Sequence, residues 1–211
     1  SVLQSNHSRM DLTNALDRLD EIHAQLAKGE VFRGYRPIPV ALSGVIGLAA
    51  GWLQPRVLPE SDAGTGFLWF WLSVAALNLA IIGGVIVAGY ARVPEPFARR
   101  HTRQVVGQFV PCLAAGAAVS LSLPALDPGL VRLLPGLWAL LLGLGIFASR
   151  PYLARATGWV ALYFVLAGSA LLAFPTADLA WLGALHGTLF GVGLLAAAGV
   201  LHLDLPRRER G

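Results

Sequence analysis

Three side chains inside apolar stretches carry groups that need hydrogen-bond partners outside their own helix: the amides of Asn78 and Gln108 and the imidazole of His186. Hydroxyl groups such as that of Thr188 can bond back to the preceding helical turn, but amides and imidazoles seldom satisfy themselves in this way. We therefore expect Asn78, Gln108, His186 and Thr188 to mark either a polar contact between helices, with Asn78 as a partner for His186, or a small ligand cavity.

A haem site would require a second axial ligand for His186, and the only histidine on the same apolar stretch is His202. Sixteen residues of helix separate the two by about 24 Å along the axis and about 160° around it. They cannot bind one haem within a single chain. The residues therefore indicate no particular cofactor.

Patterns that support catalysis are missing from the sequence. It has no phosphate-binding glycine motif, no serine elbow and no His or Cys cluster with metal spacing. Its lone cysteine, Cys112, follows Pro111 inside an apolar stretch and is interpreted as a small apolar filler. Because the apolar stretches also lack paired acids or a nucleophile with its base, we expect no catalytic residue, no metal site and no enzyme activity.

The elements that position these groups are long and apolar. With 55% apolar and only 13% charged residues, the chain lies outside the range of soluble globular proteins. About 20 apolar residues span a bilayer as a helix. The sequence predicts an all-α polytopic membrane protein with six such helices: Pro37–Leu53, Gly66–Tyr90, Val105–Leu123, Leu133–Ser149, Ala156–Phe174 and Leu179–Leu203. Pro55 is expected to end the first of them.

Basic residues fall in alternate gaps between these segments. Fourteen of the sixteen Lys and Arg residues lie before the first segment, in the second and fourth gaps or in the tail, and only Arg56 and Arg132 lie in the other gaps. Lys and Arg are retained on the cytoplasmic side. We expect a multi-pass protein of the inner (cytoplasmic) membrane with both termini in the cytoplasm. The basic residues would touch anionic lipid, and we expect no nucleic-acid partner.

Aromatic residues gather at the ends of the predicted segments. Trp52 closes the first, Trp69 and Trp71 open the second, and Trp181 opens the sixth. Tryptophan favours the headgroup region because it joins an apolar ring to a polar edge. We expect these four to anchor the chain at the membrane interface.

The part of the chain before residue 37 predicts a water-soluble helix. Residues 1–9 are interpreted as a tag or disordered start, 10–29 as a cytoplasmic amphipathic helix, 30–36 as an interfacial elbow, 37–203 as the transmembrane domain and 204–211 as a basic cytoplasmic tail. The apolar stripe of the helix comprises Leu12, Ala15, Leu19, Ile22 and Leu26. A stripe of this kind must be buried. The alternatives are a second copy, a cytoplasmic protein, or the cytoplasmic loops of the chain itself.

Small residues recur at four-residue spacing, which lets helix backbones approach closely in lipid. The rows are Ser43, Gly47 and Gly51; Ala80, Gly84 and Ala88; Ala114, Ala118 and Ser122; and Gly183, Gly187 and Gly191. We expect contacts through them within the chain, between copies in a homo-oligomer, or with other membrane proteins.

Two further patterns bear on architecture. Arg36, Pro39, Gly47 and Pro55 recur as Arg132, Pro135, Gly143 and Pro151, which is explained either by an inverted repeat of two three-helix halves or by coincidence, since prolines are common at loop edges. In segment number and length the chain is similar in outline to the substrate-binding subunits of energy-coupling-factor vitamin importers. That likeness carries no residue over.

These observations lead to two functional hypotheses. The first is a noncatalytic membrane subunit or regulator that associates with itself or other membrane proteins and docks a partner through its N-terminal helix. The alternative is a small-solute transporter or membrane ligand-binding protein with a cavity near Asn78, Gln108 and His186.

Overall fold

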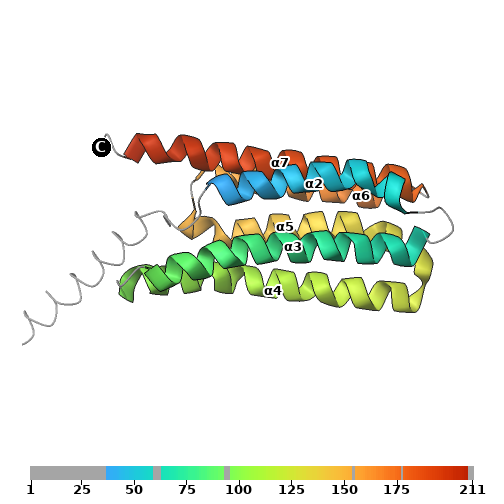
Figure 1. Cartoon of the computed structure of the whole chain (residues 1–211), viewed down its shortest axis with the longest axis horizontal. Coiled ribbons are helices and arrows are strands. Elements are labelled where there is room, and N and C mark those ends of the chain that lie inside the picture. The colour runs from blue at the N-terminus through green and yellow to red at the C-terminus, as the bar shows by residue number, and fades with distance from the viewer. Residues whose placement is uncertain (1–36, 59–62, 93–95, 154, 177, 209–211) are drawn as a thin grey trace, which may run out of the picture.

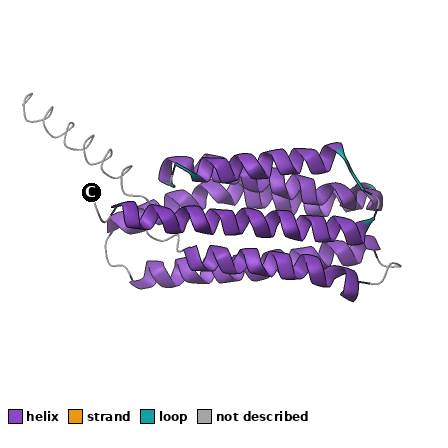
Figure 2. Cartoon of the chain, turned by 90° about the horizontal axis from the view of Figure 1, so that it is seen from above, coloured by secondary structure: helices purple, strands orange, loops and turns teal. Residues whose placement is uncertain are grey.

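The computed structural model describes residues 37–58, 63–92, 96–153, 155–176 and 178–208, and this part of the chain is helical and contains no strand. Its elements are α2 (Pro37–Val57), α3 (Ala63–Arg92), α4 (Pro96–Leu126), η2 (Pro128–Leu133), α5 (Leu134–Ser149), η3 (Arg150–Tyr152), α6 (Thr157–Ala173) and α7 (Leu179–Arg208). The long helices lie side by side in one bundle and alternate in direction (Figures 1 and 2). The predicted all-α class is confirmed. The predicted helix 10–29 and elbow 30–36 lie outside the described residues.

Within the described residues, five stretches of helix are long and apolar enough to cross a membrane: Pro37–Val57, Gly64–Ala88, Val106–Leu126, Pro128–Ser149 and Leu179–Leu203. They are compatible with a multi-pass membrane protein. The remaining apolar helix, α6, has 17 residues and rises about 26 Å, slightly less than a typical hydrocarbon core. The sixth crossing therefore stays a prediction.

Several helices extend past their predicted ends. Helix α2 continues through Pro55 to Val57, and the Leu58 amide donates to the Gln54 carbonyl at 3.0 Å, so the helical turn persists beyond the proline. Proline removes one backbone donor, but neighbouring helices compensate for this loss in membrane bundles. Helix α4 begins at Pro96, nine residues before its predicted start. Proline is compatible with a first helical turn, whose amide groups have no partner in the helix.

Helices α2 and α7 form the most extensive contact in the bundle. A Cβ atom added at Gly51 would lie 2.9 Å from the Gly187 Cα, and one added at Gly187 would lie 2.5 Å from the Gly51 Cα. At Gly44 an added Cβ would lie 3.0 Å from the Gly191 carbonyl oxygen. Two glycine rows thus bring the backbones together, and Ser43 is buried beside them.

A second glycine contact joins α5 to α6. A Cβ added at Gly168 would lie 2.7 Å from the Gly136 carbonyl oxygen and 2.8 Å from the Leu140 amide nitrogen. A Cβ added at Gly143 would lie 2.9 Å from the Ala161 carbonyl oxygen. These neighbours are backbone atoms that cannot turn aside. The α5–α6 pair therefore depends on glycine as the α2–α7 pair does.

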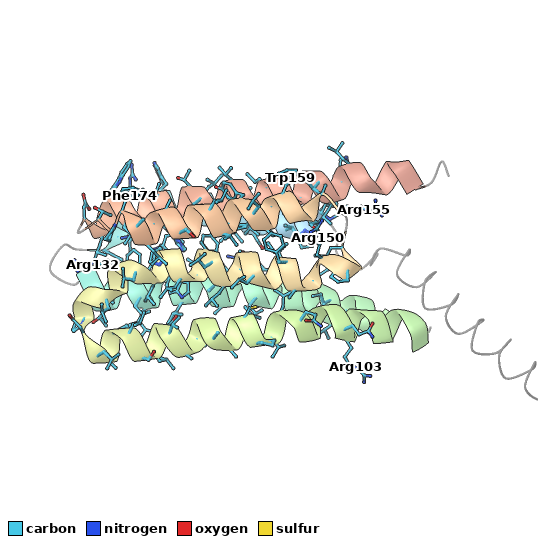
Figure 3. All side chains as sticks on the ribbon, turned by 180° about the vertical axis from the view of Figure 1, so that it is seen from behind. Arg103, Arg132, Arg150, Arg155, Trp159 and Phe174 are labelled. Atoms are coloured by element: carbon cyan, nitrogen blue, oxygen red, sulfur yellow. The ribbon has the colours of Figure 1, made fainter. Side chains whose placement is uncertain are left out.

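Helix α4 lies on the side of the bundle away from α7 (Figures 1 and 3), and it contacts α3 little. In the most apolar 18-residue stretch of each of these two helices, only 6% is buried inside the bundle, against 44% for the corresponding stretches of α2, α5 and α7. Ala80, Gly84 and Ala88 are exposed on α3, and the row on α4 is exposed as well. A Cβ added at Gly84 would meet nothing within 4 Å.

The pairing of helices does not follow an inverted repeat. A repeat relating the first three long helices to the last three would make the α4–α5 contact equivalent to the α2–α7 contact. The closest partner of α5 is instead α6, through glycine, and the equivalent contact of α2 with α3 is small. The recurring prolines and glycines therefore lack a matching arrangement of contacts.

Candidate functional site

The four predicted polar residues occupy different environments. His186 on α7 is buried with 4% exposure, Asn78 on α3 is half-buried, and Gln108 on α4 and Thr188 on α7 are exposed. The Asn78 amide donates to the Val74 carbonyl at 3.0 Å, and the Thr188 hydroxyl donates to the Ala184 carbonyl at 2.8 Å. Both groups therefore donate within their own helices, while the Asn78 Oδ1 is buried and has no partner among the described residues. Of the four, only His186 lies deep in the bundle.

Aromatic rings surround the His186 imidazole. The Trp71 ring of α3 meets it edge to face, with centroids 4.4 Å apart, and the tilted Phe190 ring of α7 lies at 4.3 Å. The Trp138 ring of α5 is tilted at 5.5 Å. Residues 186 and 190 meet because they are one helical turn apart. Three helices thus supply the rings around the imidazole. An edge-to-face contact such as that with Trp71 adds stability beyond the burial of apolar area.

Burial of Trp71 differs from the expectation that it anchors the interface. Trp69 is 60% exposed, as an anchor would be, whereas Trp71 is 4% exposed and packs against Phe67 and Phe70. Two residues of helix turn a side chain by about 200°, so neighbouring tryptophans point to opposite sides. The position at the helix end suggested one role for both, but the direction of each side chain decides which of them enters the bundle.

Trp138 belongs to a hydrogen-bond chain that is complete. Its indole Nε1 donates to the Ser120 Oγ at 2.9 Å, and the Ser120 hydroxyl donates to the Gly116 carbonyl at 2.7 Å. Ser120 is 1% exposed. This chain links α5 to α4 on one side of the imidazole, and both of its donors are paired.

Gln54, near the end of α2, is a buried polar residue that was not singled out from the sequence. Its side chain is 2% exposed, and its Nε2 donates to the Leu179 carbonyl at 3.2 Å. A Cβ on Gly183 would coincide with the Gln54 Oε1, so the amide occupies the space left by that glycine. The spacing of the residues could have predicted this burial, because Gln54 lies one turn beyond Gly51 on the same helix face as Gly47 and Gly51. The expected helix end at Pro55 concealed it.

Three buried polar atoms in this region have no hydrogen-bond partner among the described residues: the Gln54 Oε1, the Trp71 Nε1 and the His186 Nδ1. A buried polar atom left unpaired costs about 1–3 kcal/mol. These three residues lie toward the same end of the bundle, near the end of α2 and the starts of α3 and α7. We refer to the three residues as the polar trio.

The chemistry open to the trio is hydrogen bonding. Among the described residues no three His, Cys, Asp or Glu side chains come together as a metal-binding group. Cys112 of α4 is half-buried and packs toward Gly145, where an added Cβ would lie 3.4 Å from its Sγ. The immediate ring neighbours of His186 are Trp71, Trp138 and Phe190, which supply neither a nucleophile nor a carboxylate. The arrangement is suited to holding an uncharged polar group.

No family model, curated protein or solved structure matches the chain.

Proposed function

We propose that this chain is a noncatalytic membrane subunit or regulator that associates with a second copy or another membrane protein through the outward sides of α3 and α4. The relevant residues are called the outer rows: Ala80, Gly84 and Ala88 on α3, and Ala114, Ala118 and Ser122 on α4.

The observation that carries this proposal is the contrast between occupied and unoccupied small-residue rows. The rows of α2 and α7 lie against each other at backbone contact. The outer rows have the same spacing but are exposed, and the backbone at Gly84 has nothing within 4 Å of an added Cβ. Helices in lipid associate by close packing at small residues. The outer rows retain this capacity after the bundle has formed.

A matched pair of substitutions on α3 tests the proposal. Gly84→Leu places a bulky side chain in the outer row, whereas Gly83→Leu makes the same change about 100° around the helix, where an added Cβ also meets nothing within 4 Å. Oligomer fraction in nanodiscs, measured by native mass spectrometry, should fall about tenfold with Gly84→Leu and change little with Gly83→Leu. Association with other membrane proteins is measured by co-purification of the same variants. Equal behaviour of the two variants in both measurements would contradict the proposal.

Docking of a cytoplasmic partner is a second part of the proposal and rests on the apolar stripe of residues 10–29. The paired changes Leu19→Asp and Ile22→Asp put charge into that stripe. Partner recovery in detergent pull-downs should be lost while membrane insertion persists. Unchanged recovery would count against docking through the stripe.

We also propose that the bundle crosses the inner membrane six times with both ends in the cytoplasm. Arg103, Arg150 and Arg155 lie at one end of the bundle and Arg132 at the other (Figure 3), which supports the predicted orientation. Single cysteines at Arg155 and Phe174, in a Cys112→Ala background, test whether α6 crosses. Both positions are exposed. An impermeant thiol reagent should label them from opposite sides of the membrane, and labelling from the same side would remove the sixth crossing.

A further inference from the structure

The polar trio combines deep burial with hydrogen-bonding atoms that the protein itself leaves unpaired. Gln54 is 2% exposed, and Trp71 and His186 are each 4% exposed. Their Oε1, Nε1 and Nδ1 atoms have no partner among the described residues. Buried polar atoms in proteins are nearly always paired, either with protein or with a small bound molecule.

The three side chains come from three helices and converge near one point on α7. The Trp71 and His186 rings are in direct contact, with centroids 4.4 Å apart. The Gln54 Oε1 takes the place of a side chain at Gly183, three residues before His186. Positions three apart on a helix have Cβ atoms about 5–6 Å apart, and helical side chains lean toward the N-terminus. The Gln54 amide oxygen therefore lies about one helical turn along α7 from His186, on the side toward which helical side chains lean.

The atoms of the trio define what they can bind. The indole Nε1 only donates a hydrogen bond, the amide Oε1 only accepts, and the imidazole Nδ1 donates or accepts according to its tautomer. A hydroxyl group meets all three, because its oxygen accepts while its hydrogen donates. An alcohol suits the tautomer with a hydrogen on Nδ1, and water suits the tautomer with a lone pair there. Aromatic surroundings disfavour a charged guest, which would lose its hydration without a countercharge.

The trio also lies close to one end of the bundle. Gln54 is three residues before the end of α2, His186 is seven after the start of α7, and Trp71 is eight after the start of α3. At about 1.5 Å per residue these positions are about 5 to 12 Å below the same end of the bundle. That depth is within reach of water and of small alcohols that partition near the headgroups.

We propose that Gln54, Trp71 and His186 form a binding site for a single hydroxyl group, supplied by a water molecule or a small alcohol. The indole donates to the hydroxyl oxygen, and the hydroxyl hydrogen is donated to the Gln54 amide oxygen. The site is independent of association through the outer rows.

A double-mutant cycle on the full chain in nanodiscs tests whether one bound hydroxyl group bridges the side chains of the trio. Trp71→Phe removes the indole donor, and Gln54→Met removes the amide oxygen. If both bind the same hydroxyl, the Tm loss of the double variant should be smaller than the sum of the single losses by about 2 °C or more. Additive losses would overturn the proposal.

The control cycle replaces Trp71→Phe with Trp138→Phe. It makes the same ring change at an indole whose Nε1 already donates to Ser120. The Gln54→Met variant also loses the bond to the Leu179 carbonyl, but that loss enters both cycles equally. The Trp138 cycle should be additive. Coupling of the same size in both cycles would contradict a guest specific to the trio.

A titration with 2,2,2-trifluoroethanol, followed by fluorine NMR, distinguishes the two sources of the hydroxyl. Saturable line broadening in the unaltered protein that disappears in Trp71→Phe identifies an alcohol site. Coupling in the cycle without saturable broadening identifies a water site. Both results support the proposal, whereas saturable broadening that survives in Trp71→Phe and Gln54→Met places the alcohol elsewhere and contradicts it.

Discussion

The α2–α7 pair and the α3–α4 pair bear the same sequence pattern and use it differently. Both carry small residues at four-residue spacing. In α2 and α7 the rows meet at backbone contact, while in α3 and α4 they point away from the bundle. Small residues at this spacing therefore encode the ability to pack closely but not the identity of the partner. Which rows meet depends on how all the helices of the bundle fit together.

The largest effect that separates the two pairs is expected from leucine at a helix contact. Gly187→Leu places a side chain where a Cβ alone would lie 2.5 Å from the Gly51 Cα and close to the Gly47 carbonyl. The free energy of unfolding should fall by about 3 kcal/mol or more, since the backbones must separate. Thermal unfolding in nanodiscs measures the loss. Gly83→Leu, in open space on α3, is the control, and an equal loss there would remove the contrast between the pairs.

A smaller effect is expected from a single methyl group within the α2–α7 contact. Gly51→Ala brings a Cβ to 2.9 Å from the Gly187 Cα, whereas the nearest atom to a Cβ at Gly47 is 3.5 Å away. Gly51→Ala should cost about 1–2 kcal/mol, and Gly47→Ala should be close to neutral. The two thermal unfolding curves provide the comparison. If both changes proved neutral, the helices would be further apart than the structure places them.

Removal of the hydrogen bond between α4 and α5 should have a still smaller effect. Trp138→Phe deletes the indole that donates to the Ser120 Oγ at 2.9 Å. The hydroxyl keeps its own bond to the Gly116 carbonyl, so no buried donor loses its partner. Beyond the lost ring area, the hydrogen bond itself should contribute about 0.6 kcal/mol. Adding Ser120→Ala should then cost little more. A large additional loss would show that Ser120 stabilises the bundle in another way.

The smallest effect, and one of opposite sign, is expected on α4. An alanine Cβ at Gly107 meets nothing within 4 Å, and alanine favours the helix over glycine by up to about 1 kcal/mol. Gly107→Ala should therefore raise Tm slightly. A fall in Tm would reveal a close contact at this position, and α4 would then be tightly packed at glycine as α2 and α7 are.

Sequence reasoning succeeded where a local property decides the structure. Continuous apolar stretches predicted the helices, because a chain in lipid must satisfy its backbone groups within each segment. The position of His186 inside such an apolar stretch also predicted that this side chain is buried. Sequence reasoning failed to find Gln54, since a proline one residue later marked the expected end of the helix, and it assigned Trp71 to the interface together with Trp69.

The environment of His186 could not be predicted, because it depends on contacts between residues far apart in the chain. Asn78 was the expected partner, yet its amide bonds to Val74, and the imidazole contacts Trp71 and Trp138 instead. Side-chain direction on each helix follows from spacing, but the rotation of one helix against another does not. The polar trio forms because the rotations of α2, α3 and α7 about their own axes together bring its three side chains into the bundle.

By itself the sequence determined the helical class, the apolar segments and the separation of basic from less basic connections, since each follows from the transfer of local groups between water and lipid. Only the tertiary structure decided which small-residue rows meet, which tryptophan enters the bundle and which polar atoms gather around α7. Those choices are made by close packing among several helices at once, and no single segment contains the information that sets them.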